Sequence, residues 1–181
     1  MSQKILISGP PRSGKSTLIK KFIQYIEKDY FIVGFFTPEI RINNKRIGFD
    51  VKAIDSNIQF PLARKGKFED TYKLGDYSVF VEKFNNFIVE YLENRIRDIE
   101  TSNDARILLI DEIGKMELFS NKFETFLRNI FQRDFSIIAT IGETLSHPIK
   151  SYLMTLPNIC LFNASIEKQG EIFDEIAKNF S

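Results

Sequence analysis

Apolar residues in this chain gather into short continuous runs that alternate with longer segments in which apolar residues recur every three or four positions. The short runs are typical of buried β-strands, and the longer spacing is typical of amphipathic helices. The runs predict strands at residues 4–8, 31–37, 106–110, 136–141 and 156–162, and the spaced segments predict helices at residues 15–27, 81–99, 123–131 and 167–179. This alternation predicts an α/β fold with a doubly wound, mostly parallel sheet and helices on both faces. Its site is expected at the carboxyl ends of the strands.

One segment departs from this alternation. Between Ile40 and Val51 apolar residues alternate with polar ones around Asn43 and Asn44, which is typical of a half-exposed β-hairpin that turns at the two asparagines. We therefore expect a small β-hairpin insertion over about residues 38–63. Residues 64–77 carry two glycines among mixed charges without a sustained period, which indicates a loop.

Four residues are interpreted as structural. Ser120 and Ser165 precede predicted helices and are expected to be N-caps. His147 stands before Pro148 and indicates a turn, and Cys160 within the last predicted strand is expected to be a small buried hydrophobe.

Length and composition favour one cytoplasmic domain spanning residues 1–181. The chain is 43% hydrophobic, and its formal net charge of +1 disfavours binding to nucleic acid or to a membrane surface by charge alone. No apolar run approaches the roughly 20 residues of a membrane span, and Gly9 interrupts the only apolar run near the N-terminus, unlike a signal peptide. A single cysteine cannot form an internal disulfide, which also favours the cytoplasm. A protein partner is not predicted.

A phosphate-binding loop lies between the first predicted strand and the first predicted helix. Residues 9–16 match the pattern G-x-x-x-x-G-K-[ST] in full, in the strand–loop–helix context that the mechanism requires. The loop's N–H groups and the helix N-terminus attract phosphate, while Lys15 is expected to reach the β- and γ-phosphates and Ser16 to bind Mg²⁺. The predicted nucleotide-binding residues here are Gly9, Pro10, Pro11, Arg12, Ser13, Gly14, Lys15, Ser16 and Thr17.

Two carboxylates follow the buried strand at residues 106–110. Asp111 is expected to hold Mg²⁺ beside the phosphate loop, and Glu112 to accept a proton from the attacking water. Lys15 and Glu112 are thus the predicted catalytic residues. No N-K-x-D segment ends a later predicted strand, so specificity for guanine is not predicted.

An arginine or lysine near the γ-phosphate would stabilise the charge that develops during phosphoryl transfer. Arg41 and Arg64 are the main candidates, with Lys115 a third. Three functions remain open at this stage: a nucleoside-triphosphatase, a nucleotide or nucleoside kinase with a mobile basic lid, and a switch that binds a partner according to its bound nucleotide.

The chain resembles the THEP-type nucleoside-triphosphatases, also called the cancer-related nucleoside-triphosphatase family. The resemblance covers most of the chain and rests on residues 9–17, 34–41, 46–50, 62–64, 111–118 and 139–141. It implies Mg²⁺-dependent hydrolysis of nucleoside triphosphates (ATP, GTP, CTP and UTP, with loose base preference) to diphosphate and phosphate. It also implies a RecA-like sheet in which the phosphate-loop strand is internal.

The resemblance further implies a second nucleotide-binding stretch, in which residues 111–115 are expected to reach phosphate or metal. This stretch consists of Leu108, Leu109, Ile110, Asp111, Glu112, Ile113, Gly114 and Lys115. The chain departs from the family at two places: Arg12 stands where glycine is usual, and residues 164–167 lack an arginine-containing turn.

Overall fold

The computed structural model describes residues 2–100 and 105–180, and within them ten strands form one mixed sheet. The strands are β1 (Lys4–Gly9), β2 (Phe31–Phe36), β3 (Glu39–Ile42), β4 (Lys45–Ala53), β5 (Gln59–Lys65), β6 (Tyr72–Leu74), β7 (Tyr77–Val79), β8 (Arg106–Ile113), β9 (Ser136–Gly142) and β10 (Ile159–Asn163). The helices are α1 (Lys15–Ile26), α2 (Val81–Asn86), α3 (Glu93–Glu100), α4 (Asn121–Ile130), α5 (Pro148–Thr155) and α6 (Gln169–Ala177). A π-helical segment (Phe87–Leu92) joins α2 to α3, and a 3₁₀ turn (Glu117–Phe119) precedes α4.

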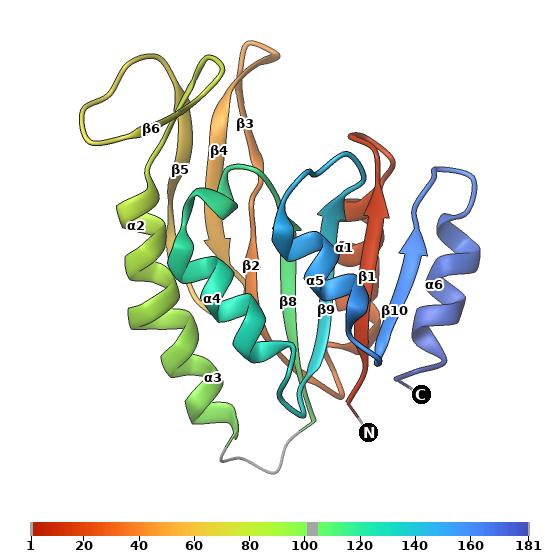
Figure 1. Cartoon of the computed structure of the whole chain (residues 1–181). Coiled ribbons are helices and arrows are strands. Elements are labelled where there is room, and N and C mark those ends of the chain that lie inside the picture. The colour runs from red at the N-terminus through yellow and green to blue at the C-terminus, as the bar shows by residue number, and fades with distance from the viewer. Residues whose placement is uncertain (1, 101–104, 181) are drawn as a thin grey trace.

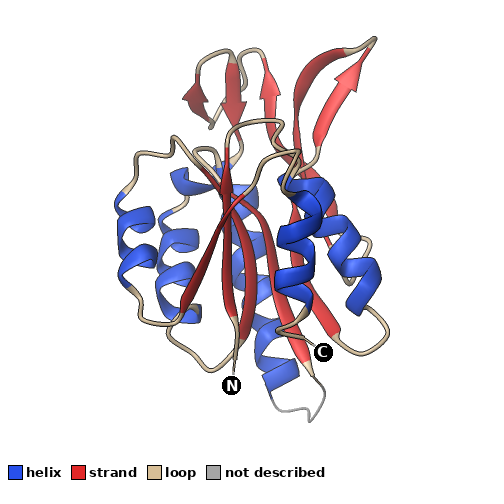
Figure 2. Ribbon diagram, turned by 90° about the vertical axis from the view of Figure 1, so that its right-hand side faces the viewer, coloured by secondary structure: helices blue, strands red, loops and turns tan. Residues whose placement is uncertain are grey.

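The sheet has a parallel half and an antiparallel half. Strands β10, β1, β9, β8 and β2 run parallel in that order, and β4, β5, β7 and β6 continue the sheet antiparallel, with β3 paired to β4. The antiparallel strands rise beyond the helices at one end of the molecule (Figure 2). The predicted α/β class and the internal phosphate-loop strand are confirmed, because β1 lies between β10 and β9.

Helices cover both faces of the parallel half (Figure 1). Within each central strand successive side chains point to opposite faces: Ile107 and Leu109 pack under α1 and α6, while Leu108 and Ile110 pack under α2 to α5. Because both faces of the central parallel strands are buried, their sequences are continuous apolar runs. Among the residues placed by the structure, no helix is long and apolar enough to cross a bilayer.

The long helix predicted at residues 81–99 forms as α2, the π-helical segment and α3 in succession. Its apolar side meets α4 and the sheet, where Phe35 makes edge contacts with Phe84, Phe87 and Phe123 at 5.6–5.8 Å between ring centroids. The predicted cap at Ser120 is confirmed, since its hydroxyl accepts a hydrogen bond from the Phe123 N–H at 2.9 Å.

Three sequence-based expectations are wrong. The insertion extends beyond a hairpin: β3 and β4 turn at Asn43 and Asn44 as predicted, but β5, β6 and β7 follow, so the predicted loop at residues 64–77 contains strand β6 and is limited to residues 66–71 and the turn at 75–76. Strands β6 and β7 have three residues each, too few to show a period.

The other two wrong expectations concern Cys160 and Ser165. Cys160 is exposed because β10 is the edge of the sheet. Helix α6 begins at Gln169 without a side-chain cap, so Ser165 is not its N-cap.

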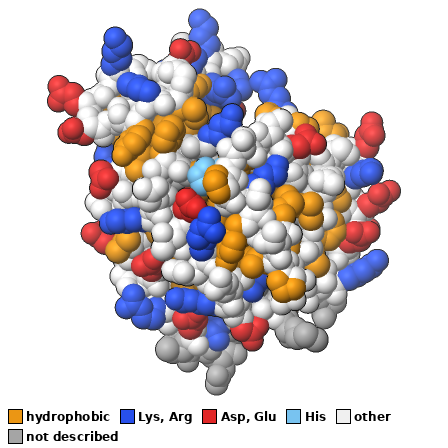
Figure 3. Space-filling view, in the orientation of Figure 1, with side chains coloured by type: hydrophobic (Ala, Val, Ile, Leu, Met, Phe, Trp, Pro, Cys, Tyr) orange, Lys and Arg blue, Asp and Glu red, His pale blue; other side chains and the backbone are white. Residues whose placement is uncertain are grey.

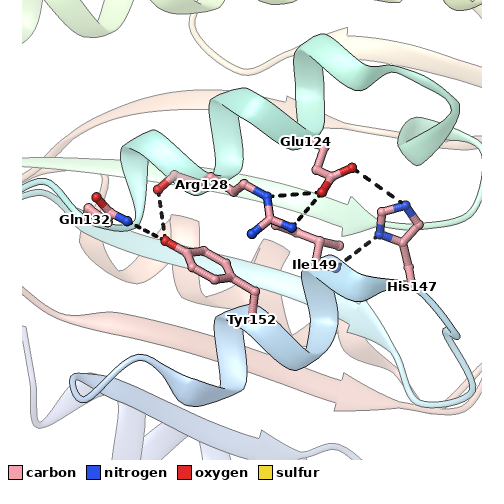
Figure 4. Close-up of polar contacts among 6 residues, drawn as sticks. All are labelled: Glu124, Arg128, Gln132, His147, Ile149 and Tyr152. Atoms are coloured by element: carbon pink, nitrogen blue, oxygen red, sulfur yellow. Dashed lines mark hydrogen bonds and ion pairs between the residues drawn. The ribbon is translucent and has the colours of Figure 1, made fainter.

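His147, which the sequence places in a turn, is the N-cap residue of α5. Its ring Nδ1 accepts a hydrogen bond from the Ile149 N–H at 3.2 Å. Figure 4 shows how the neighbouring side chains join α5 to α4. On α4, Arg128 donates a hydrogen bond to Glu124 at 2.7 Å, and its guanidinium lies over the ring of Tyr152 on α5, 4.5 Å from the ring centroid. This network lies on a face where acidic and basic side chains are interspersed (Figure 3).

Two glycine-to-alanine substitutions test the packing of β2 against β8. Gly34 has φ 129° and no room for a Cβ, which would overlap with the carbonyl oxygen of Leu109, whereas a Cβ at Gly170 in α6 would meet open space. We expect Gly34→Ala to lower the free energy of unfolding by about 2–4 kcal/mol and Gly170→Ala to change it by less than about 1 kcal/mol, measured by urea denaturation. Equal stability of the two variants would contradict this account.

Candidate functional site

A cavity of about 800 Å³ lies at the carboxyl ends of the parallel strands, between the phosphate loop and the antiparallel insertion. This volume lies within the usual range for small-molecule sites. Three parts of the chain line it: the phosphate loop with the start of α1, the end of β8 with the residues after it, and insertion residues that include Arg46, Phe49 and Leu74. The cavity therefore lies where the alternation of strands and helices predicts a site.

The phosphate loop folds around the side chain of Lys15. Gly14 takes φ 86° as the N-cap of α1, and Arg12 takes φ 64° in the loop itself. Lys15 is only 7% exposed. Its ammonium donates hydrogen bonds to the carbonyls of Gly9 at 2.8 Å and Pro10 at 3.0 Å. A cation is thus held beside the open N-terminus of a helix, and the two together favour an anionic ligand such as phosphate.

Ser16 and Asp111, the predicted metal ligands, line the same cavity. Asp111 is 6% exposed, and one of its carboxylate oxygens accepts a hydrogen bond from the Thr140 hydroxyl at 2.6 Å. Thr140 lies on β9, the strand between β1 and β8, so it reaches Asp111 from the neighbouring strand. One hydroxyl and one carboxylate are a donor set that suits Mg²⁺, which fills its other positions with water and phosphate oxygens.

Glu112 extends from the same strand into the cavity, after a cis peptide bond to Asp111. Burial raises the pKa of the Glu112 carboxyl, and the negative charge of Asp111 raises it further, whereas the positive charge of Lys15 acts in the opposite direction. A partly buried carboxyl beside a cation can accept a proton from a bound water molecule.

A third carboxyl in the cavity, Glu117, has no predicted role from the sequence beyond its place in the family motif. Glu117 is 4% exposed, and burial together with the nearby charge of Glu112 raises its pKa to about 8. In the sequence, Glu117 stands out only as an acidic residue between the apolar Met116 and Leu118, just after the predicted site residues. The stretch is too short for its pattern to predict that the Glu117 side chain faces the cavity.

Of the three cations predicted to lie near the γ-phosphate, Arg64 and Arg41 lie away from the cavity. Arg64 pairs with Asp50 and donates to the Phe49 carbonyl at 2.7 Å, while Arg41 pairs with Glu39 at 2.7 Å on the hairpin. Neither lines the cavity.

Four other cations do line it: Arg12, Lys20, Arg46 and Lys115. Arg46 is held in place by its Nε, which donates to the Tyr77 hydroxyl at 2.8 Å, and by the Phe49 ring at 5.4 Å. Lys115 is therefore the one of the three predicted candidates that the fold brings to the cavity.

The four apolar residues of the second predicted stretch lie in the core. Leu108, Leu109, Ile110 and Ile113 are fully buried on the two faces of the sheet. They fix the end of β8, from which Asp111 and Glu112 reach the cavity.

Comparison with known proteins gives a consistent match over almost the whole chain. A family model described as "NTPase" matches residues 4–177. The nucleoside-triphosphatase THEP1 of Methanocaldococcus jannaschii is 33% identical over 96% of this chain and 94% of its own length, and the human cancer-related nucleoside-triphosphatase is 32% identical over 97% and 95%. The crystal structure of THEP1 from Aquifex aeolicus superposes with a TM-score of 0.82 at 31% identity, covering 96% of each chain.

The hydrogen bond between Thr140 and Asp111 is open to a direct test. Thr140→Val removes the hydroxyl and leaves a buried carboxylate oxygen without that donor, so we expect the free energy of unfolding to fall by about 1–3 kcal/mol. The same substitution at Thr155, whose 2.7 Å hydrogen bond to the Tyr152 carbonyl is exposed, should cost less than about 1 kcal/mol because water replaces the hydroxyl. Urea denaturation of both variants measures the difference, and equal losses would argue against a special role for Thr140.

Proposed function

The chain belongs to the NTPase family, and on this premise we propose that it hydrolyses nucleoside triphosphates to the diphosphate and phosphate, with Mg²⁺ as cofactor and little preference for the base. The observation that carries the proposal is that Lys15 and Ser16 line one cavity with Asp111 and Glu112, which lie about a hundred residues further along the sequence. We also propose that the protein acts in the cytoplasm, on free nucleotides and not on nucleic acid or membranes.

The phosphate loop binds the triphosphate in this proposal. The backbone N–H groups around Gly14 and the N-terminus of α1 bind the phosphate oxygens, and Lys15 neutralises the β- and γ-phosphates. Ser16 and Asp111 would hold Mg²⁺, which supplies further positive charge at the phosphates when bound. Most of the rate enhancement then comes from positioning the triphosphate and from stabilising the negative charge on its phosphates.

Glu112 activates the water molecule. Its carboxylate lies at the strand end that faces Lys15, so a water beside the γ-phosphate would lie within reach of a base. The charge that develops at the γ-phosphate is stabilised in this proposal by Lys15, with Arg46 and Lys115, two of the four further cations that line the cavity, as additional candidates.

A kinase is the second candidate, because the cavity continues past the phosphate loop. It extends to Phe49 and Leu74 of the insertion and to Met116, which together offer an apolar wall for a phosphoryl acceptor. A kinase needs an acceptor for turnover, so phosphate release without one favours the hydrolase.

Removal of the Lys15 ammonium tests the phosphate loop. We expect Lys15→Ala to abolish measurable binding of ATP by isothermal titration calorimetry, because the loop loses the cation that it holds toward the phosphates. Lys21→Ala is the matched control, since it removes an exposed lysine from the same helix outside the cavity and should leave binding unchanged. Unchanged affinity in Lys15→Ala would refute the assignment of the phosphate loop.

The proposed reaction is tested by phosphate release with Mg²⁺ and ATP, GTP, CTP or UTP, without an acceptor. We expect release from all four, and Glu112→Gln should bind nucleotide normally but turn over about 10²–10⁴-fold more slowly, because glutamine cannot accept the proton. Glu90→Gln, an exposed acid that does not line the cavity, is the control and should keep the full rate. Full activity in Glu112→Gln would place the base elsewhere, and absence of release despite binding would favour the kinase.

A further inference from the structure

Arg12 has a backbone conformation that is unusual for its residue type. Its φ of 64° lies in the left-handed region, where the Cβ of an L-residue crowds the backbone. In the part of the chain that the structure describes, the other non-glycine residues with positive φ are Asn43, Asn44 and Asp70. Their short polar side chains tolerate this region, whereas that of an arginine does not. The backbone at Arg12 is therefore strained, and such strain is concentrated at functional sites.

The turn of the phosphate loop imposes this conformation. The Ser13 N–H donates to the Pro10 carbonyl at 3.2 Å, with Pro11 and Arg12 between them. A proline in the second position and a positive φ in the third are the features of a type II turn, whose third position favours glycine. Glycine at position 12 would thus form the same turn without strain. The arginine lowers the stability of the folded chain unless its side chain makes a compensating interaction.

The side chain of Arg12 is free to make that interaction with an anion. Arg12 is exposed and lines the cavity together with Gly14 and Lys15. No residue that the structure describes forms an ion pair or a hydrogen bond with its guanidinium. Arg46, the other arginine of the cavity, is instead held by the Tyr77 hydroxyl. A planar guanidinium with free N–H groups matches the oxygens of a phosphate group.

We propose that the side chain of Arg12 is a second phosphate-binding cation of the loop, which contacts the phosphate chain of the nucleotide in addition to Lys15. This inference rests on the proposed function, because it requires that the phosphate loop binds a nucleotide. The contact offsets the strain of the Arg12 backbone in the nucleotide complex. In the free protein the strain persists, so the arginine increases nucleotide affinity and decreases stability.

The exposure of Arg12 indicates that it acts on binding and not on the chemical step. Water screens the charge of an exposed side chain, so small changes of phosphate charge in the transition state alter its contact little. Lys15, which is 7% exposed, responds more strongly to those changes. Arg12 is therefore expected to lower KM for the triphosphate without raising kcat.

Three substitutions separate the charge of Arg12 from its backbone. Arg12→Ala removes the guanidinium but keeps a Cβ in the strained turn, Arg12→Gly removes both, and Arg12→Lys keeps a charge without the planar fork. By isothermal titration calorimetry at low salt, we expect the Kd for ATP to rise by about tenfold in the Ala and Gly variants and by about threefold in the Lys variant. Unchanged affinity in Arg12→Ala would overturn the proposal, as would a loss in Arg12→Ala that Arg12→Gly does not share.

The dependence on salt and on the base identifies the group that Arg12 contacts. The ratio of Kd between Arg12→Ala and the wild type should fall below about threefold near 1 M salt, because the Debye length is then only about 3 Å. The ratio at low salt should be similar for ATP, GTP, CTP and UTP. A ratio that persists at high salt, or that holds for one base alone, would indicate a contact with the nucleoside and would overturn the phosphate contact.

Steady-state kinetics test whether Arg12 acts on binding alone. With Mg²⁺ and ATP, Arg12→Ala should raise KM in parallel with Kd and keep kcat within about threefold of the wild type. A fall in kcat of tenfold or more at saturating ATP would place Arg12 among the catalytic groups and contradict its assignment to binding.

The melting temperature without nucleotide tests the strain. Arg12→Gly should melt about 1–4 °C above both the wild type and Arg12→Ala, since the relief of strain exceeds the flexibility that glycine adds to the unfolded chain. Asn44→Gly is the matched control, because Asn44 has φ 61° in an exposed turn outside the cavity, and it should leave the Kd for ATP unchanged. A melting temperature of Arg12→Gly at or below that of Arg12→Ala would refute the strain.

Failure of this proposal and failure of the proposed function give different results. A wild-type protein that binds none of the four triphosphates would refute both. A wild type that binds and hydrolyses them while Arg12→Ala binds equally well would refute only the role of Arg12.

Discussion

The site depends on one constraint, namely that charges of opposite sign must be buried together at the ends of parallel strands. Lys15 and Asp111 are each under 10% exposed, and a buried charge without partners is strongly destabilising. Two loop carbonyls accept from the Lys15 ammonium, and the Thr140 hydroxyl donates to Asp111. Gly9 ends β1, Pro10 follows it in the loop, and Thr140 lies on β9, so the phosphate loop partners Lys15 and the strand next to β8 partners Asp111.

The antiparallel insertion gives the cavity its other wall. It extends the sheet from β2 through β4, and an ion pair between Arg64 and Asp50 joins β5 to β4. Aromatic contacts of Phe49 and Tyr77, at 5.9 Å between ring centroids, hold Arg46 between two strands of the insertion. Neighbours within the same sheet thus position the charged side chains of the insertion, including Arg46 at the cavity.

The sequence predicts those parts of the molecule that local chemistry determines. The phosphate loop, the buried strands and the long helix follow from residue spacing, because a strand buried on both faces and an amphipathic helix leave clear patterns. The roles of Arg64 and Arg46 could not be distinguished from sequence, since only the register between β4 and β5 pairs Arg64 with Asp50. The exposure of Cys160 could not be predicted for a similar reason, because the position of β10 at the sheet edge depends on the order of all the strands.

The cavity also places two glutamates, Glu112 and Glu117, five positions apart in the sequence, among different charged neighbours. Burial raises the pKa of both carboxyls; the charge of Lys15 acts against this at Glu112, whereas the charges of Glu112 and Asp111 raise the pKa of Glu117 further. Gly114 allows this arrangement because the absence of a Cβ leaves room for both carboxyls beside its Cα. A substitution that removed the Lys15 charge would therefore raise the pKa of the Glu112 carboxyl further, so the phosphate loop and the end of β8 are electrostatically coupled.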